Sequence, residues 1–248
     1  MKISPLWFRA AVIVMGAHLL PAATRTPVLL ELFTSEGCSS CPPADALLEE
    51  LDRSQPFASS ELVVLSEHVD YWNQLGWKDP YSSAIFSARQ NEYAGHLSSP
   101  DVYTPELIVD GTWQVIGSDR AAIRHAVNKA SVQPKQPIGV EANLNGSSGT
   151  VHVTISPVLG TGKADVYVAL AKNHVISYVA HGENAHRTLS HTSVAYRLTK
   201  LGSMESGARF EKQLSVELTP SSDGQTRVIV FAQDPRTGRI IALTQTII

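Results

Sequence analysis

The sequence contains very little cysteine: only Cys38 and Cys41 among 248 residues. A small domain that depends on disulfides for stability uses many cysteines, so this chain is not a disulfide scaffold. A bridge between residues so close in sequence closes a short loop and stabilises the folded state only weakly. The Cys-x-x-Cys spacing at the start of a helical pattern is more typical of redox chemistry.

Charge is also scarce. The net charge is -3 and only 17% of residues are charged, against about 25% in a typical globular protein. The near-neutral balance gives no reason to expect nucleic acid or an anionic membrane surface as a partner. The low charged fraction agrees with a protein that works outside the cytoplasm.

Two common catalytic motifs are absent. No glycine cluster leads from a strand into a helix, as in a phosphate-binding loop, and no Gly-x-Ser-x-Gly nucleophile motif is present. The histidines at 181, 186 and 191 have a spacing that matches no familiar metal-ligand pattern. We therefore predict no cofactor and no resident metal, although the two thiols with a histidine could bind copper(I) or zinc.

A long apolar run occurs only at the N-terminus. Lys2 and Arg9 precede an apolar stretch over residues 10–20, and Pro21-Ala22-Ala23 supplies small residues. This order predicts a signal peptide over residues 1–23, and the stretch is shorter than the ~20 residues of a membrane span. We expect a secreted or periplasmic protein with no integral membrane segment after cleavage; the alternative is an uncleaved N-terminal anchor.

The chain divides into two halves at a linker over residues 132–137. In the first half strand patterns at 28–33, 62–65, 106–109 and 112–116 alternate with helical patterns at 44–51, 81–97 and 118–127. Asp110-Gly111 between two strand patterns predicts a hairpin. This order predicts an α/β domain with a mixed sheet over residues 26–131.

The second half has a different pattern. Apolar and polar residues alternate at 151–155, 166–170, 210–218 and 227–231, with clusters of turn residues between them. Several short strands at this spacing predict an all-β, sandwich-like domain over residues 138–248.

Thiol–disulfide chemistry needs an attacking thiolate, a resolving thiol and a proton acceptor. Cys38 is the predicted nucleophile, because the helix N-terminus favours negative charge, and Cys41 then resolves. Pro42-Pro43 have no N–H to offer, so we expect a smaller pKa decrease than an all-amide first turn would give. Glu31 either relays the proton of Cys41 or makes ordinary hydrogen bonds. Glu36 is expected to be exposed to solvent, where it slightly disfavours the thiolate.

Three segments, residues 31–45, 68–80 and 102–111, resemble the DUF1223 family of secreted proteins. Residues 182–189 resemble that family's second-domain segment, with His186 where the family has glycine. The order of a strand, Cys-x-x-Cys at a helix start and a later Thr104-Pro105 is also similar to the thioredoxin superfamily. The resemblance implies a thioredoxin-like domain at 26–131 joined to a β-rich domain, and no established activity.

The same resemblance implies roles for further residues. In the thioredoxin superfamily the proline matching Pro105 is cis and packs against the disulfide, and the residue matching Thr104 binds peptide through its backbone. Trp72 and Trp77 crowd the segment after the second strand, where they either contact a peptide or fix the insertion to the core. His68 with Asp70 could serve acid–base chemistry or form a structural hydrogen bond.

Together these features predict an exported thiol–disulfide oxidoreductase or redox sensor, whose partner is a protein or peptide thiol or disulfide. One alternative is a non-catalytic peptide- or protein-binding module with a permanent disulfide. Another is a copper or zinc metallochaperone.

Overall fold

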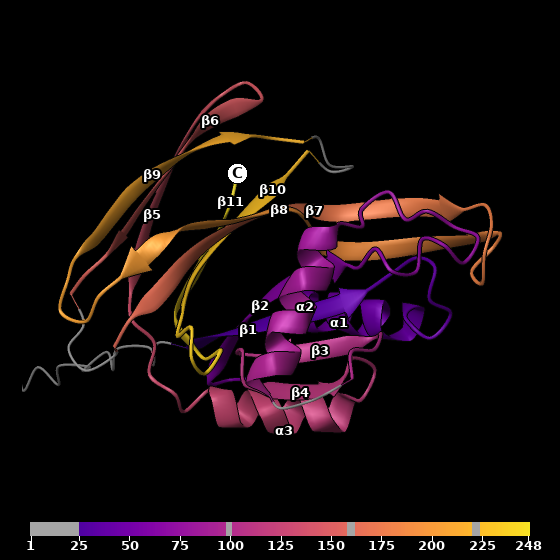
Figure 1. Cartoon of the computed structure of the whole chain (residues 1–248), viewed down its shortest axis with the longest axis horizontal. Coiled ribbons are helices and arrows are strands. Elements are labelled where there is room, and N and C mark those ends of the chain that lie inside the picture. The colour runs from indigo at the N-terminus through magenta and orange to yellow at the C-terminus, as the bar shows by residue number, and fades with distance from the viewer. Residues whose placement is uncertain (1–24, 98–100, 158–161, 220–223) are drawn as a thin grey trace, which may run out of the picture.

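The computed structural model describes residues 25–97, 101–157, 162–219 and 224–248. The predicted signal peptide at 1–23 lies outside these residues. Within them, no helix combines the length and apolar character needed to cross a membrane. One long twisted sheet runs through the molecule, with helices on both of its faces at one end and a second, smaller sheet over the other end (Figure 1).

The first half forms the α/β end of the molecule. Its elements are, in chain order, β1 (Thr26–Thr34), α1 (Pro42–Ser54), β2 (Ser60–His68), α2 (Ala84–His96), β3 (Glu106–Val109), β4 (Trp113–Ile116) and α3 (Arg120–Ala130). The strand order is β2-β1-β3-β4, with β1 and β2 parallel and the other pairs antiparallel. The predicted mixed sheet is confirmed, and so is the hairpin at Asp110-Gly111, where both residues have positive φ.

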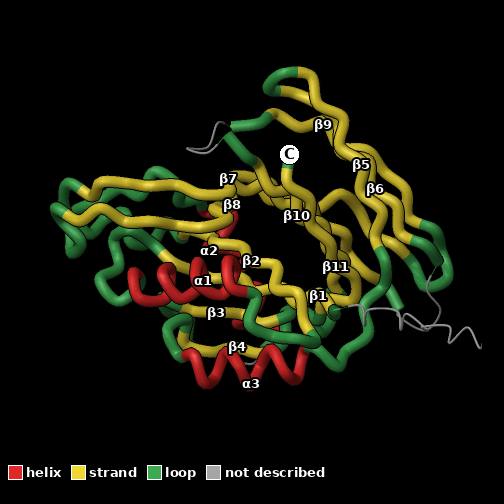
Figure 2. Tube along the Cα trace, turned by 180° about the vertical axis from the view of Figure 1, so that it is seen from behind, coloured by secondary structure: helices red, strands yellow, loops and turns green. Residues whose placement is uncertain are grey.

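Alternation along β1 explains where the helices pack. Val28, Leu30 and Leu32 share one core cluster with apolar residues of α1 and α3. Leu29 belongs to a second cluster that includes Phe86 of α2. Because successive side chains of a strand point to opposite faces, α1 and α3 cover one face of the sheet and α2 covers the other (Figure 2).

The second half does not form a separate sandwich, contrary to the prediction. Its strands are β5 (Ile138–Asn145), β6 (Ser148–Ile155), β7 (Ala164–Val179), β8 (Arg187–Met204), β9 (Phe210–Glu217), β10 (Thr226–Gln233) and β11 (Ile240–Ile247). Four of them extend the sheet of the first half, in the order β11-β10-β7-β8-β2. The other three form the small antiparallel sheet β5-β6-β9. Alternation shows that one face of a strand is buried, but not which strand lies at its edge.

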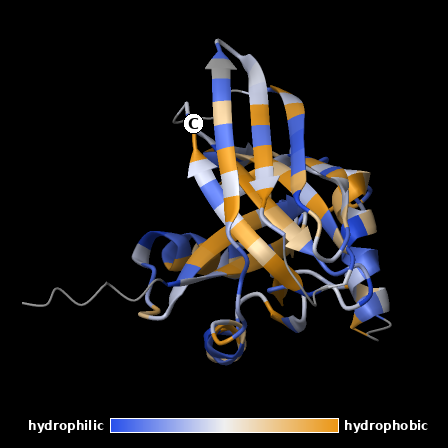
Figure 3. Cartoon of the chain, turned by 90° about the vertical axis from the view of Figure 1, so that its left-hand side faces the viewer, coloured by the Kyte–Doolittle hydropathy of each residue, from blue (hydrophilic) through white to orange (hydrophobic). Residues whose placement is uncertain are grey.

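The two sheets do enclose a common apolar core. Residues of β6 and β9, such as Val153 and Phe210, pack against Val168 and Val230 of the large sheet. Figure 3 shows the alternation that builds this core as hydrophilic and hydrophobic bands along the strands. The sandwich-like contact that the pattern predicted is therefore present, but one of its sheets continues into the first half.

The hairpin of β7 and β8 positions the candidate site. These strands of 16 and 18 residues run past the end of the small sheet, and β8 lies beside β2 at Ser66↔Val194. Ser190 of β8 donates a hydrogen bond to Glu49 of α1 (2.9 Å). This bond holds the hairpin against α1, and bonds from Glu183 and Asn184 at its tip reach the cysteine loop before α1.

Candidate functional site

The two cysteines form a disulfide at the N-terminal end of α1. Cys41 occupies the N-cap position, and Pro42-Pro43 begin the helix. Neither cysteine has any exposed surface, whereas Ser39 and Ser40 between them are exposed. The predicted position of the pair at the start of a helix is confirmed. In this conformation, however, neither sulfur is exposed for nucleophilic attack.

Thr104 and Pro105 lie next to this loop. The peptide bond between them is cis, as the resemblance implied, and the Ser40 hydroxyl donates to the Thr104 carbonyl (3.4 Å). Trp72 Nε1 donates to Thr104 Oγ1 at 2.8 Å, so the structure also brings this predicted residue to the site. An open, mostly apolar groove of about 570 Å³ runs along Ser40, Thr104 and Pro105 to the exposed Ile116.

The loop between β7 and β8, residues 180–186, covers the Cys-x-x-Cys segment, and we call it the cap. The buried Asn184 side chain donates to the carbonyls of Glu36 and Cys38, each at 2.9 Å. Glu183 Oε2 accepts from Ser39 N at 3.0 Å. Sequence reasoning marked this segment only as similar to a family and gave it no role. The cap ties the second half of the chain directly to the disulfide.

Glu36 and Trp77 both contact the cap. Glu36 is completely buried, which corrects the expectation of an exposed side chain. Trp77 Nε1 donates to Glu36 Oε2 at 2.7 Å, and Gly182 of the cap lies against the Trp77 side chain. This contact matches the alternative that Trp77 fixes the insertion in place; its role in substrate binding stays a prediction.

A buried charged cluster lies on the inner side of the cysteine loop. His191 of β8 places Nε2 3.7 Å from Glu36 Oε1 and Nδ1 3.6 Å from Asp45 Oδ2. Burial opposes protonation, but the two carboxylates outweigh it and raise the pKa of His191 to about 10. We call Glu36, Asp45 and His191 the acidic cluster, because it places two carboxyl groups against one imidazole.

His68 extends this cluster. Its ring contacts that of His191 edge-on, with centroids 4.8 Å apart. Its Nδ1 lies 2.7 Å from Asp79 Oδ2, which also accepts from Glu36 N at 2.8 Å. The predicted partner Asp70 binds Ser87 instead. Among the residues that the structure describes, no group of three or more His, Cys, Asp or Glu side chains is arranged to hold a metal.

Glu31 belongs to a different network. It is buried on β1 and accepts hydrogen bonds from Arg89 Nε (2.6 Å) and from the Tyr93 hydroxyl, both on α2. Its neighbours Leu30 and Leu32 face α1, so Glu31 points to the opposite face of the sheet from the helix that carries the disulfide. Relay of the Cys41 proton by Glu31 stays a prediction, and this placement does not favour it.

The comparisons with known proteins agree with the resemblance in the sequence. A family profile described as "Protein of unknown function (DUF1223)" matches residues 29–233. The chain belongs to the DUF1223 family. No curated protein matches it.

This DUF1223 protein resembles a solved structure over nearly its whole length. It is an X-ray crystal structure of a protein from Agrobacterium tumefaciens, with 29% sequence identity and a TM-score of 0.66, covering 91% of this chain and 95% of that one. A DUF3823 family protein from Bacteroides ovatus reaches a TM-score of only 0.28 at 16% identity, covering 46% of this chain and 55% of its own. A β-glucosidase from Kluyveromyces marxianus reaches 0.24 at 9% identity, with 46% and 14% covered. TM-scores this low support no inference about this chain.

The cap of this DUF1223 protein contains a histidine in a backbone conformation that suits glycine. His186 has φ of 64°, in the left-handed region that side chains with a Cβ rarely occupy. The resemblance places a glycine at this position, which fits the observed backbone. His186 Nδ1 lies 3.2 Å from the Tyr178 hydroxyl, so the imidazole forms a hydrogen bond at the surface.

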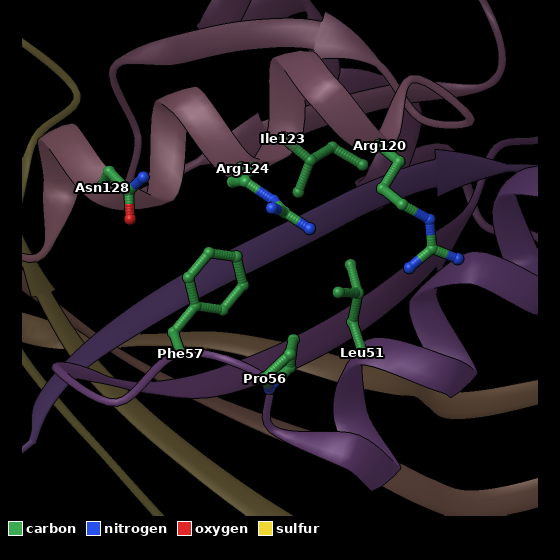
Figure 4. A pocket seen from close by; sticks show the side chains of 7 residues that line it. All are labelled: Leu51, Pro56, Phe57, Arg120, Ile123, Arg124 and Asn128. Atoms are coloured by element: carbon green, nitrogen blue, oxygen red, sulfur yellow. The ribbon is translucent and has the colours of Figure 1, made fainter.

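A second cavity lies away from the disulfide. It has a volume of about 190 Å³ between α1 and α3, and Figure 4 shows Arg120 and Arg124 above Leu51 and Phe57. Leu51 is ten residues along the chain from Cys41, or about 15 Å along a helix. This cavity is therefore not part of the candidate site.

Proposed function

We propose that this DUF1223 protein is an exported thiol–disulfide exchange protein that uses Cys38 and Cys41. The observation that carries the proposal is the position of the disulfide, which lies at the start of α1 and directly beside the cis bond before Pro105. The apolar groove along Thr104 and Pro105 offers a place for an extended segment of a partner. Export is supported by the signal-like sequence at 1–23.

The strand and helix order supports a thioredoxin-like unit over residues 26–131. Three helices on the sheet β2-β1-β3-β4, with a cysteine pair starting the first helix, agree with that assignment. Residues 138–248 then act as a β-rich domain that supplies the cap and the other half of the large sheet. In this proposal the second domain controls access to the disulfide of the first.

Exchange begins when a partner thiolate attacks Cys38 Sγ. The bond between Cys38 and Cys41 breaks, a mixed disulfide forms, and Cys41 takes up a proton. A second partner thiol then attacks the mixed disulfide, releases Cys38 and leaves as the partner disulfide. Two electrons and two protons pass from the partner dithiol to the pair, and the reverse sequence reduces a partner disulfide. Because both cysteines are buried, the cap must move away first.

A trapping experiment tests this function. In the Cys41→Ser variant, Cys38 can attack a partner disulfide but the mixed disulfide cannot be resolved. Covalent adducts should therefore accumulate with oxidised insulin, which offers disulfides, and not with insulin that has been reduced and alkylated. The Cys38→Ser variant is the matched control, because it keeps one thiol but loses the predicted nucleophile. Adducts confined to Cys41→Ser support the proposal. Absence of adducts in both variants, with the cysteine thiol reactive after denaturation, would reject it.

A non-catalytic binding module is the second candidate function. The observation that favours it is the complete burial of both cysteines, which suits a permanent disulfide. In that case the disulfide would have a reduction potential below about -300 mV, and the protein would not reduce insulin. A potential in the range of exchange catalysts would instead favour the first candidate.

A further inference from the structure

Most of the backbone donors that would stabilise a thiolate at the start of α1 are missing or already bonded. Pro42-Pro43 occupy the first two helical positions and have no N–H. The next two donors, Ala44 N and Asp45 N, both bond to the Cys41 carbonyl at 2.8 and 3.1 Å. Cys41 N itself donates to the Cys38 carbonyl at 3.2 Å. The first turn of this helix therefore differs from the amide-rich turns that lower a thiol pKa.

Two amide donors in the loop before the helix are also already hydrogen-bonded. Cys38 N donates to the Ser35 carbonyl at 3.1 Å, and Ser39 N donates to the Glu183 carboxylate of the cap. The Cys38 sulfur has one hydroxyl within reach, that of Ser40 at 3.4 Å. A single hydroxyl at this separation is a weak replacement for two or three amide donors.

Two buried carboxyl groups lie close in sequence to the cysteines. Asp45 follows Cys41 by four residues, so their side chains share one face of the helix, about 6 Å apart at Cβ. Asp45 is buried, and its carboxylate oxygens accept no hydrogen bond from any described residue. Glu36 is buried two residues before Cys38. His191 is the single imidazole that lies between these two carboxyl groups, 3.7 Å from Glu36 Oε1 and 3.6 Å from Asp45 Oδ2.

Other titratable groups also face His191. The groups that face it are Glu36 from the loop after β1, Asp45 from α1, His68 from β2, and Tyr81, with Asp79 bound to His68, from the segment after β2. Burial and then the charges of Glu36 and Asp79 raise the pKa of Tyr81, so it stays neutral near pH 7. His191 is thus the cation that the carboxylates share.

We propose that reduction of the disulfide gives a neutral dithiol, with both Cys38 and Cys41 protonated at pH 7, because the site offers the sulfurs acidic neighbours and few donors. When a dithiol reduces the pair, that dithiol becomes a disulfide and both of its protons end on the two cysteine sulfurs. A strong oxidant gains its driving force from a stabilised thiolate. The reduced protein therefore donates electrons to partner disulfides. This direction of electron transfer rests on the proposed function.

The pH dependence of reduction tests the proposal on the intact protein. Oxidised protein is equilibrated with dithiothreitol, whose thiols stay protonated, at pH values from 6 to 8, and the reduced fraction is quantified by alkylation. A neutral dithiol predicts an equilibrium constant that changes less than about twofold over this range. A stabilised thiolate would raise the constant by up to tenfold per pH unit, and a rise of about tenfold or more between pH 6 and pH 8 would overturn the proposal.

Variants identify the groups responsible. Asp45→Asn removes one buried carboxylate and should move the thiol titration curve about one pH unit lower, followed by ultraviolet thiolate absorbance. Glu50→Gln is the matched control, because it removes a carboxylate from the exposed side of the same helix and should change nothing. Pro43→Ala supplies an N–H and should also raise the thiolate fraction, which keeps the test available should Asp45→Asn not fold. Unchanged thiolate in both variants would overturn the proposal.

Insulin reduction, measured beside the titration, separates this inference from the proposed function. A neutral dithiol that does not reduce insulin would contradict the exchange function and leave the inference standing. Active exchange by a pair with a thiol pKa below about 7 would contradict the inference alone.

Discussion

Replacing His191 with glutamine should abolish a pH dependence of stability that the acidic cluster builds into the fold. The pKa of His191 is raised from 6.5 to about 10 in the folded protein. The folded state therefore holds this proton more tightly than the unfolded state. The stabilisation is complete below pH 6.5 and is lost as the pH rises from 6.5 through 10.

The size of the effect follows from the pKa difference. One pKa unit corresponds to about 1.4 kcal/mol, so the loss between pH 6.5 and 10 is at most about 5 kcal/mol. His191 is 1% exposed, so solvent and salt screen its ion pairs little. At pH 7 the glutamine variant also leaves the carboxylates of Glu36 and Asp45 without their cation, which should cost about 3–5 kcal/mol.

The assay is urea unfolding of the oxidised protein at a series of pH values from 6 to 10. Keeping the disulfide intact removes thiol titration from this window. His152→Gln is the matched control, because His152 lies near Glu211 on the surface with 32% of its side chain exposed. Subtracting the variant curve from the wild-type curve cancels the other groups that titrate. Parallel curves for wild type and His191→Gln would refute the reasoning.

Three further predictions concern the cap and the sheet. Asn184→Leu removes the donors to two carbonyls of the cysteine loop, so dithiothreitol should reduce the disulfide about tenfold faster; an unchanged rate would show that the cap does not limit access. His186→Gly relieves a left-handed backbone and should stabilise the protein by about 1 kcal/mol in thermal unfolding, and destabilisation would contradict this. Arg89→Met removes the cation that is paired with the buried Glu31 and should cost about 3–5 kcal/mol at pH 7, whereas a loss below 1 kcal/mol would contradict this reasoning.

The elements of the first half could be predicted because their patterns are local. The apolar face of α1, the strand at 28–33 and the Asp110-Gly111 turn each depend on residues close in sequence. The position of the cysteine pair at a helix start followed from the same reasoning. Pro105 needed the resemblance, because sequence alone leaves the isomer of a proline open.

The errors come from long-range pairing. The sequence analysis predicted no strand over residues 187–204, so it did not anticipate that β8 pairs with β2 and continues the first sheet. Such a pairing is chosen by the whole fold. Glu36 was expected to be exposed because its neighbours read as a turn. It is buried by Trp77, Asn184 and His191, and the last two are about 150 positions away. The contacts that define the candidate site are mostly of this kind.

The reduction potential of the Cys38–Cys41 pair tests the central claim most directly. Equilibration with glutathione or dithiothreitol buffers at pH 7, with the thiols trapped by alkylation, gives the value. The account predicts a potential within the range of exchange catalysts, about -120 to -270 mV, and near its reducing end because no thiolate is stabilised. A potential below about -300 mV would place the pair among structural disulfides and contradict the proposal that it exchanges with a partner.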